Sequence, residues 1–432
     1  MQMTSEDSSG SSPLKVLFYG TYPNQPIGYG KIANILSNYL ASQELDLYYC
    51  GISNYEDMAV ERFIDPRIKF IDVLAEEKRR GSTELYAVDI IEGIVDQVKP
   101  DVILLYNDII VISRLLLELD QKKVKERVNY KMIVYLDLVY EYERIDFVRH
   151  VDRHTDAIIV FSECWKKNMM KMGVVEEKLY VMHHGFNEDM FKRIDKMEAR
   201  QKIGIGEDDF VVLNINRNSY RKAHDISIRA FLMFYKANGC NKKIKMFLNS
   251  HLETSDGYTL LRVIETECVR LGLSYEEVIM NAILRPANRP GYVSDDYINS
   301  LYNACDVGIN TCFGEGFGLC NMEHAAMGAP QIVNGVGALK DIFSVGWSYV
   351  VEPAAILQIA NHMDGHGGDL AVCRAEDVAE GLQHYYDNPE GRAEDGEQIS
   401  AYIRKKYNWR RILNEFARDF NRIVWGETHV SR

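Results

Sequence analysis

The sequence predicts an α/β protein with two consecutive domains, each built on a doubly wound parallel sheet. Short runs of apolar, β-branched and aromatic residues alternate with segments of helical periodicity. These runs are apolar throughout, as in strands that a sheet buries on both faces. The alternation pauses over the charged residues 187–209 and then starts again, which indicates a second unit.

The expected elements follow one another in a regular order. The first unit has expected strands at 15–19, 45–50, 68–71, 102–106, 132–136, 157–161 and 179–182, and helices at 31–40, 84–98, 110–119 and 163–172. The second has strands at 210–216, 244–248, 278–284, 307–310 and 331–334, and helices at 223–237, 259–271, 295–304, 318–327 and 376–386. Residues 397–424 are expected to form helices. We therefore expect a disordered lead-in at 1–12, a first domain at 13–190 completed by a C-terminal helix at 408–432, and a second domain at 191–407.

Composition excludes several classes of protein. The 432 residues carry a net charge of −13, which argues against a nucleic-acid partner. No apolar run approaches the roughly 18 residues of a transmembrane helix. Residues 1–12 lack the basic and apolar regions of a secretion signal, so we expect a cytoplasmic protein. The basic, methionine-rich residues 165–172 leave a peripheral membrane contact open, although core packing explains them better.

The most informative motif is FGEGFGLCNMEHAAMGAP at residues 313–330, between an expected strand and an expected helix. Its glycines allow backbone to approach a ligand closely. The first turn of the helix then offers unpaired N–H groups to a phosphate. Glu315 and Glu323 stand eight positions apart and can accept hydrogen bonds from sugar hydroxyls. The alternative is an ordinary glycine-rich turn with one exposed and one capping glutamate.

Two further loops follow the first strand of each unit. Arg217 and Lys222 follow the strand at 210–216 and could neutralise a diphosphate, or form a solvated basic loop. Gly28 and Gly30 follow the first strand of the chain and open a helix, where an anion can bind closely. Because ligands of such sheets bind at the carboxyl ends of the strands, all three loops are expected at one cleft between the domains.

These motifs, in this order, resemble the family 4 type of GT-B fold glycosyltransferases, also called group 1 glycosyltransferases. The resemblance covers about residues 14–425. Its most specific part is the E-x7-E spacing of Glu315 and Glu323, followed by Ala326-Met327-Gly328-Ala329-Pro330. The resemblance implies two Rossmann-like domains facing a central cleft. It also implies a retaining, metal-independent transfer of a hexose from a nucleotide sugar to an acceptor hydroxyl.

The resemblance also implies roles for individual residues. Arg217 and Lys222 would hold the donor diphosphate, and the backbone of Gly316, Phe317, Gly318 and Leu319 would contact its phosphates. Glu315 would contact the transferred sugar, and Glu323 the ribose. The loop that begins at Arg285 would face the base. GDP-mannose is the first expectation for the donor, ahead of UDP-sugars, and the acceptor stays open among a glycan, a lipid and a small molecule.

The sequence departs from the family at one position near the reacting carbon. A histidine is common there, at the end of the middle strand of the first domain, and this chain has Asp137 in that region. A carboxylate there can position the acceptor hydroxyl, or serve as an N-cap or salt-bridge partner. No Asp-x-Asp motif occurs, so we expect no metal and no further cofactor. A GT-B epimerase or phosphorylase, and a non-catalytic protein that binds sugar nucleotides, remain as alternatives.

Overall fold

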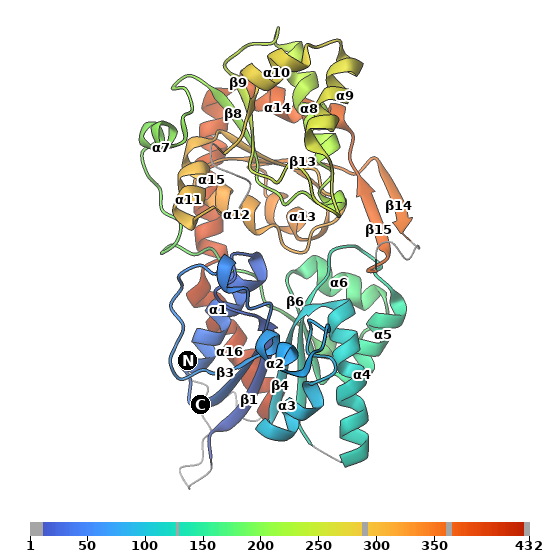
Figure 1. Cartoon of the computed structure of the whole chain (residues 1–432). Helices are drawn as coiled ribbons and strands as arrows, with labels where there is room; N and C mark the ends of the chain where they lie inside the picture. The colour runs from blue at the N-terminus through green and yellow to red at the C-terminus, as the bar shows by residue number, and fades with distance from the viewer. Residues whose placement is uncertain (1–11, 127–128, 287–292, 360–364, 427–432) are drawn as a thin grey trace.

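The computed structural model describes residues 12–126, 129–286, 293–359 and 365–426. They form two α/β lobes, stacked one above the other in Figure 1. The expected lead-in at 1–12, apart from Ser12, and the end of the expected helix at 408–432 lie outside the described residues. So does most of the loop expected to face the base, at 287–292.

The first lobe is built on a sheet of seven parallel strands in the order β3-β2-β1-β4-β5-β6-β7. Its strands are apolar and mostly buried, as expected for a sheet covered by helices on both faces. They span Leu14–Thr21 (β1), Leu45–Ile52 (β2), Lys69–Asp72 (β3), Val102–Asp108 (β4), Lys131–Asp137 (β5), Ala157–Val160 (β6) and Leu179–Val181 (β7).

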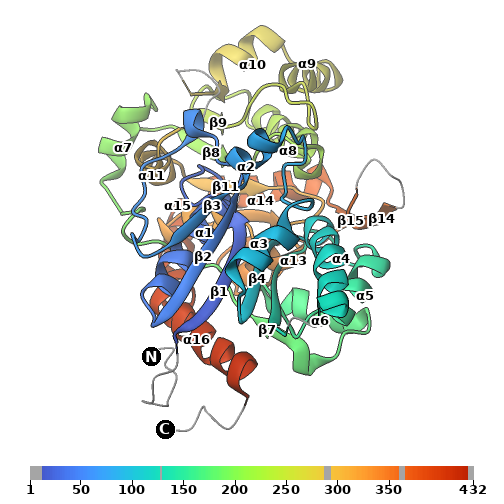
Figure 2. The ribbon, with the colours of Figure 1, turned by 60° about the horizontal axis from the view of Figure 1, so that its bottom comes forward.

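The helices of this lobe connect successive parallel strands. They are Gly28–Ala41 (α1), Val73–Arg80 (α2), Ile91–Val98 (α3), Ile109–Glu126 (α4), Ile145–His154 (α5) and Glu163–Lys171 (α6), with 3-10 turns at Glu56–Met58 and Glu176–Lys178. Figure 2 shows α3 and α4 in front of the sheet and α16 behind it.

The second lobe repeats this arrangement with six parallel strands in the order β10-β9-β8-β11-β12-β13. The strands span Phe210–Asn214 (β8), Ile244–Leu248 (β9), Ile283–Leu284 (β10), Val307–Asn310 (β11), Gln331–Asn334 (β12) and Tyr349–Val351 (β13). An antiparallel hairpin, Ala355–Ile359 (β14) with Gly368–Val372 (β15), follows the sheet. Two sheets of this kind confirm the predicted fold class.

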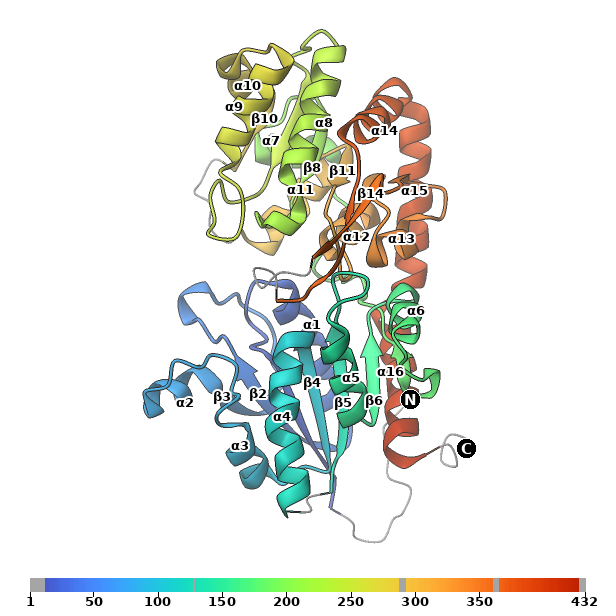
Figure 3. The ribbon, with the colours of Figure 1, turned by 90° about the vertical axis from the view of Figure 1, so that its right-hand side faces the viewer.

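The helices of the second lobe are Lys196–Ile203 (α7), His224–Ala237 (α8), Leu260–Leu271 (α9), Tyr275–Asn281 (α10), Asp295–Ala304 (α11), Leu319–Ala326 (α12), Gly337–Phe343 (α13), Ala375–Asp387 (α14) and Pro389–Lys406 (α15), with a 3-10 turn at Tyr220–Lys222. The last helix, Trp409–Trp425 (α16), continues from α15 into the first lobe (Figure 3). Its apolar residues Ile412, Phe416 and Phe420 are buried at the expected helical spacing. Within the described residues, no helix combines the length and apolar character that crossing a bilayer requires.

Both sheets reverse their strand order at the point where a ligand is expected. The first sheet reverses between β1 and β4, and the second between β8 and β11. Loops that follow strands on the two sides of a switch point diverge and leave a crevice. The segments that carry Gly28, Arg217 and Glu315 follow β1, β8 and β11 respectively. The fold therefore brings the three predicted loops to the two switch points.

Two expected elements are wrong in part. The strand expected at 278–284 is mostly helix α10, and only Ile283–Leu284 pairs with β9. Ser274 caps this helix by accepting a hydrogen bond from the Glu277 N–H, a start signal that outweighs the short apolar run. The helix expected at 84–98 begins only at Ile91. The Glu84 carboxylate accepts hydrogen bonds from the backbone of Tyr86 and Val88, and this holds the preceding residues in a loop.

Candidate active site

The site is assembled first from two loops of the second lobe. The Thr311 hydroxyl donates to the Ala223 carbonyl at 2.9 Å, and the Phe313 N–H donates to the Arg221 carbonyl at 2.8 Å. The Arg221 guanidinium in turn donates to the Gly314 carbonyl at 2.5 Å. The loop after β8 is thus tied to the loop after β11, and basic side chains lie directly beside the glycine-rich motif.

Glu315 lies at the centre of this contact. Its buried carboxylate pairs with the Lys222 ammonium, and the Arg221 guanidinium lies 3.8 Å from the same oxygen. Burial by itself would raise the pKa of Glu315, but Lys222 and Arg221 outweigh it and lower that pKa. Glu315 therefore stays ionised at neutral pH, with two cations beside the segment expected to bind phosphate.

The backbone after Glu315 is arranged for anion binding. Gly318 precedes helix α12 with φ +86°, a conformation that favours glycine, and no side chain caps the helix. The Asn321 N–H donates to the Gly318 carbonyl at 3.1 Å, and among the described residues the N–H groups of Leu319 and Cys320 before it remain available to a phosphate. The Trp165 indole of the first lobe donates to the Gly316 carbonyl at 2.7 Å and fixes this backbone across the domain boundary.

Glu323 lies one helical turn inside α12 and is also buried. One of its carboxylate oxygens accepts a hydrogen bond from the Tyr302 hydroxyl at 2.8 Å. The other lies 3.2 Å from the ammonium of Lys31, which comes from α1 of the first lobe. The carboxylate predicted to bind a ribose therefore carries an ion pair that joins the two lobes.

The first lobe faces this motif with its own glycine loop. A Cβ on Gly28 would lie 3.3 Å from the Leu319 side chain, so the start of α1 packs against the start of α12. A Cβ on Gly30 would lie only 2.3 Å from the Gln25 carbonyl, which explains why this tight turn requires glycine. Between the two glycines, the Tyr29 hydroxyl donates to the Asp137 carboxylate at 2.6 Å.

Asp137 ends strand β5 and meets the glycine-rich motif across the boundary. Its second carboxylate oxygen is buried and has no hydrogen-bond partner within the described part of the chain, and a Cβ on Gly316 would lie 2.2 Å from it. Burial raises the pKa of Asp137 to about 7, against the hydrogen bond from Tyr29 and the positive charge of Arg221, which lower it. This carboxyl group therefore changes charge near neutral pH, a property expected of groups that handle protons.

The lobes are in contact beside Glu323. A cavity of about 20 Å³ lies beside Lys31 and Glu323, and residues of both lobes line it, including Leu319, Gly185 and Trp409. That volume has room for about one water molecule, whereas small-molecule sites occupy roughly 300–1,000 Å³. This cavity alone therefore does not hold a sugar nucleotide.

Two predicted residues lie away from this group. Arg217 is exposed and forms an ion pair with Asp256, so it does not join Lys222 at Glu315. Arg285 is exposed just beyond β10. Arg221 takes the place beside Glu315, and the tandem Arg221-Lys222 in the loop is a signal that could have indicated it. Lys31 and Tyr302, which hold Glu323, are distant in sequence and carried no such signal.

Comparisons with known proteins agree with this geometry. The family model of "Glycosyl transferases group 1" matches residues 274–365. An uncharacterized glycosyltransferase of Methanocaldococcus jannaschii is 26% identical over 208 residues, which cover 46% of this chain and 48% of that protein. The matched segments thus span about half the length of the curated relatives.

Solved structures extend the likeness to nearly the whole chain. Sucrose-phosphate synthase from Thermosynechococcus elongatus superposes with a TM-score of 0.69 at 15% identity, over 95% of this chain and 99% of that one. The Anabaena protein HepE, solved in complex with UDP-glucose, superposes with a TM-score of 0.67 at 16% identity, over 94% and 99%. The chain therefore has the GT-B fold of glycosyltransferases, and its residues 274–365 match the group 1 glycosyltransferase family.

Proposed function

We propose that this protein is a retaining glycosyltransferase that moves a hexose from a nucleotide sugar to an acceptor hydroxyl without a metal ion. The observation that carries the proposal is the meeting of Asp137 with the motif from Glu315 to Gly318 across the domain boundary. An acceptor-side carboxyl of near-neutral pKa thus faces a loop built for an anionic donor.

The second lobe would hold the donor. Lys222, Arg221 and the first turn of α12 supply fixed positive charge where a diphosphate leaving group develops negative charge. Arg217 would reach the diphosphate only after leaving Asp256. Glu323 is a natural partner for the two hydroxyls of a ribose, because a carboxylate accepts two hydrogen bonds at once.

Donor binding would require a change at the domain boundary. Lys31 now occupies one oxygen of Glu323, so a ribose must displace it or share the carboxylate. Because the lobes close over the site, we expect them to open for donor entry and to close again for transfer. Closure would exclude water and limit hydrolysis of the donor.

The transfer itself needs no protein nucleophile. The acceptor oxygen forms a bond to the anomeric carbon while the bond from that carbon to the phosphate oxygen breaks. The leaving phosphate takes the acceptor proton, so both events occur on one face and the configuration is retained. Ionised Asp137 would accept a hydrogen bond from the acceptor hydroxyl and orient it, and Glu315 would contact hydroxyls of the transferred sugar.

GDP-mannose is our first donor for testing. UDP-glucose stands beside it because HepE was solved with that molecule. Calorimetry would measure the binding of both donors to the wild-type protein and to Glu323→Ala. We expect one donor to bind and Glu323→Ala to weaken it about 100-fold, since two hydrogen bonds to a charged group are lost. Glu352→Ala, at an exposed carboxylate of the same domain, is the matched control.

Analysis of the reaction products distinguishes a retaining transferase from the alternative functions. Release of free nucleotide, with the sugar transferred or hydrolysed and its α or β configuration kept in early NMR spectra, supports a retaining transferase. Inversion of that configuration would refute the retaining mechanism. An altered free sugar would indicate an epimerase, a sugar phosphate formed with inorganic phosphate would indicate a phosphorylase, and binding without turnover would indicate a non-catalytic protein. No binding of any sugar nucleotide would refute the proposed function.

A further inference from the structure

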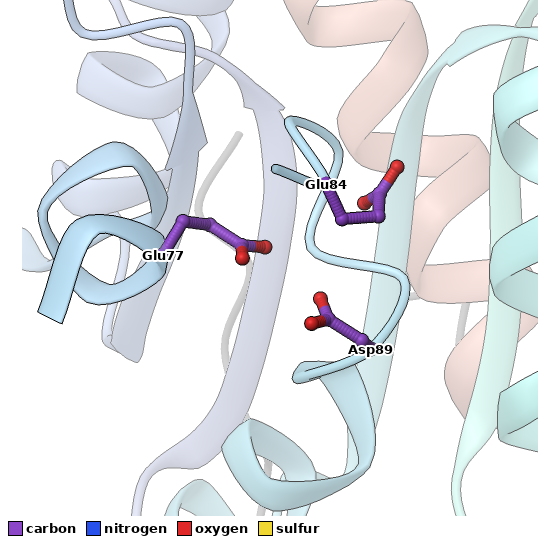
Figure 4. A group of neighbouring side chains, drawn as sticks. All are labelled: Glu77, Glu84 and Asp89. Atoms are coloured by element: carbon purple, nitrogen blue, oxygen red, sulfur yellow. The ribbon is translucent and has the colours of Figure 1, made fainter. Parts of the chain in front are cut away.

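A group of three carboxylates lies outside the site described above. Glu77 comes from helix α2, and Glu84 and Asp89 come from the loop between α2 and α3. One oxygen from each residue lies within 4.8 Å of the others. Figure 4 shows the Glu77 side chain extending from its helix toward the loop that carries the other two. Three negative charges at this separation repel one another unless something compensates them.

Glu77 is the residue that points to a ligand. Its side chain is 1% exposed, and both of its carboxylate oxygens are buried with no hydrogen-bond partner among the residues that the structure describes. A buried carboxylate is costly unless a cation or hydrogen-bond donors satisfy it.

The neighbouring positive charge does not satisfy this group. Arg114 pairs with Glu84 at 3.1 Å, and within the described residues no ion pair reaches Glu77 or Asp89. The Ser82 hydroxyl donates to Asp89 at 3.1 Å, which orients that carboxylate but adds no charge. The group therefore keeps an excess of negative charge around a buried, unpaired carboxylate.

We propose that Glu77, Glu84 and Asp89 bind a hard divalent cation, with Ca²⁺ as the first expectation. Oxygen-only ligands favour Ca²⁺, Mg²⁺ or Mn²⁺ over metals that prefer nitrogen or sulfur. Ca²⁺ accepts six to eight oxygen ligands in flexible geometry, whereas Mg²⁺ demands a near-ideal octahedron. Ca²⁺ is therefore the cation that we expect first, and since Glu84 and Asp89 are partly open to solvent, water completes the coordination.

The cation would hold a loop in place rather than take part in transfer. The loop that carries Glu84 and Asp89 contacts the central strand β1, where the Tyr19 hydroxyl donates to the Tyr86 carbonyl at 3.0 Å. A cation shared by α2 and this loop would fix both beside the end of that strand. The site is independent of the proposed transferase reaction, which needs no metal ion.

Thermal unfolding of the full chain tests the proposal. The protein is treated with a chelator, dialysed, and titrated separately with CaCl₂, MgCl₂ and MnCl₂. We expect Ca²⁺ at 100 times its Kd to raise the unfolding midpoint by about 5 °C or more. Asp89→Asn and Glu77→Gln should remove this rise. Glu76→Gln, at a half-buried carboxylate of the same helix that pairs with Arg79 instead, should keep it.

A second measurement covers variants that fold poorly. Tb³⁺ bound at the site should luminesce when Tyr86 is excited, and Ca²⁺ should lower this luminescence in the wild-type protein by displacing Tb³⁺. The Asp89→Asn variant should give no Tb³⁺ luminescence from the site. The proposal is overturned if none of the three cations raises the midpoint, or if Asp89→Asn responds like wild type. It is also overturned if the wild type ignores cations and Glu77→Gln is more stable, since Glu77 then holds a proton instead.

Discussion

The pKa of Asp137 gives the sharpest prediction, because it ties stability to pH at a single buried group. Unfolding exposes the carboxyl group to water and returns its pKa from about 7 to 3.8. Between these values the native state holds a proton that the unfolded state has lost. The contribution of Asp137 to stability is therefore fully present below pH 3.8, and it is lost as the pH rises through about 7.

The size of this effect follows from the shift. A displacement of about three pKa units corresponds to about 4 kcal/mol at 1.36 kcal/mol per unit. Asp137→Asn removes the charge but keeps an oxygen that can accept the Tyr29 hydrogen bond. Relative to wild type, the variant should therefore gain stability as the pH rises, by up to about 4 kcal/mol near pH 8.

The measurement is urea unfolding of both proteins at several pH values, read as the difference between them. The difference is needed because buried histidines act in the opposite direction. Burial lowers the pKa of His184 and of His324 to about 3, so their contribution to stability is lost as the pH falls. Both proteins share these histidines, and subtraction removes them. Parallel stability curves for wild type and Asp137→Asn would refute the reasoning.

Tyr29→Phe supplies an independent control for the same group. The hydroxyl of Tyr29 stabilises the ionised carboxylate by donating to it at 2.6 Å. Its removal should raise the pKa of Asp137 further and move the change in stability to higher pH. If Asp137 orients the acceptor as proposed, the pH at which transferase activity rises should move in the same direction.

Two further predictions concern the motif beside Asp137. Lys222→Met should lower the free energy of unfolding by about 3–5 kcal/mol, because it leaves Glu315 buried with only the more distant Arg221. Urea unfolding measures this free energy, and a loss below about 1 kcal/mol would contradict the prediction. Gly316→Ala should push the lobes apart, because its Cβ would lie 2.2 Å from the Asp137 carboxylate. Small-angle scattering should show a larger radius of gyration than wild type, whereas Gly93→Ala, whose Cβ meets nothing within 4 Å, should leave the radius unchanged.

Much of the fold could be predicted from local patterns. Strands such as Ile244–Leu248, Val307–Asn310 and Gln331–Asn334 have the expected bounds, since a continuous apolar run followed by polar or glycine residues marks a buried parallel strand. The failures come from side chains that compete for the backbone. Glu84 holds backbone N–H groups in a loop, and Ser274 starts a helix where β-rich residues indicated a strand.

The residues of the candidate site differ in whether the sequence alone could indicate them. The residues that sequence reasoning could find carry their own local signal: Glu315 and Glu323 by spacing, and Lys222 and Gly28 by position after a strand. The partners of these residues depend on how the lobes meet, and no local pattern encodes that. Lys31 and Glu323 are separated by 292 residues, and Tyr29 and Asp137 by 108.

This division bears on how the site works. The residues that a local sequence pattern indicated are the ones that would contact the donor, and their patterns do not depend on how the lobes meet. The partners found only in the structure, Lys31 on Glu323 and Tyr29 on Asp137, both come from helix α1 of the first lobe. The first of these contacts joins the lobes, and a ribose at Glu323 would displace Lys31 or share the carboxylate with it. The second contact comes from the same helix turn, and the hydroxyl of Tyr29 there stabilises the ionised form of Asp137, the carboxyl group on the acceptor side. Helix α1 is therefore the element that contacts both carboxylates, Glu323 in the second lobe and Asp137 in the first.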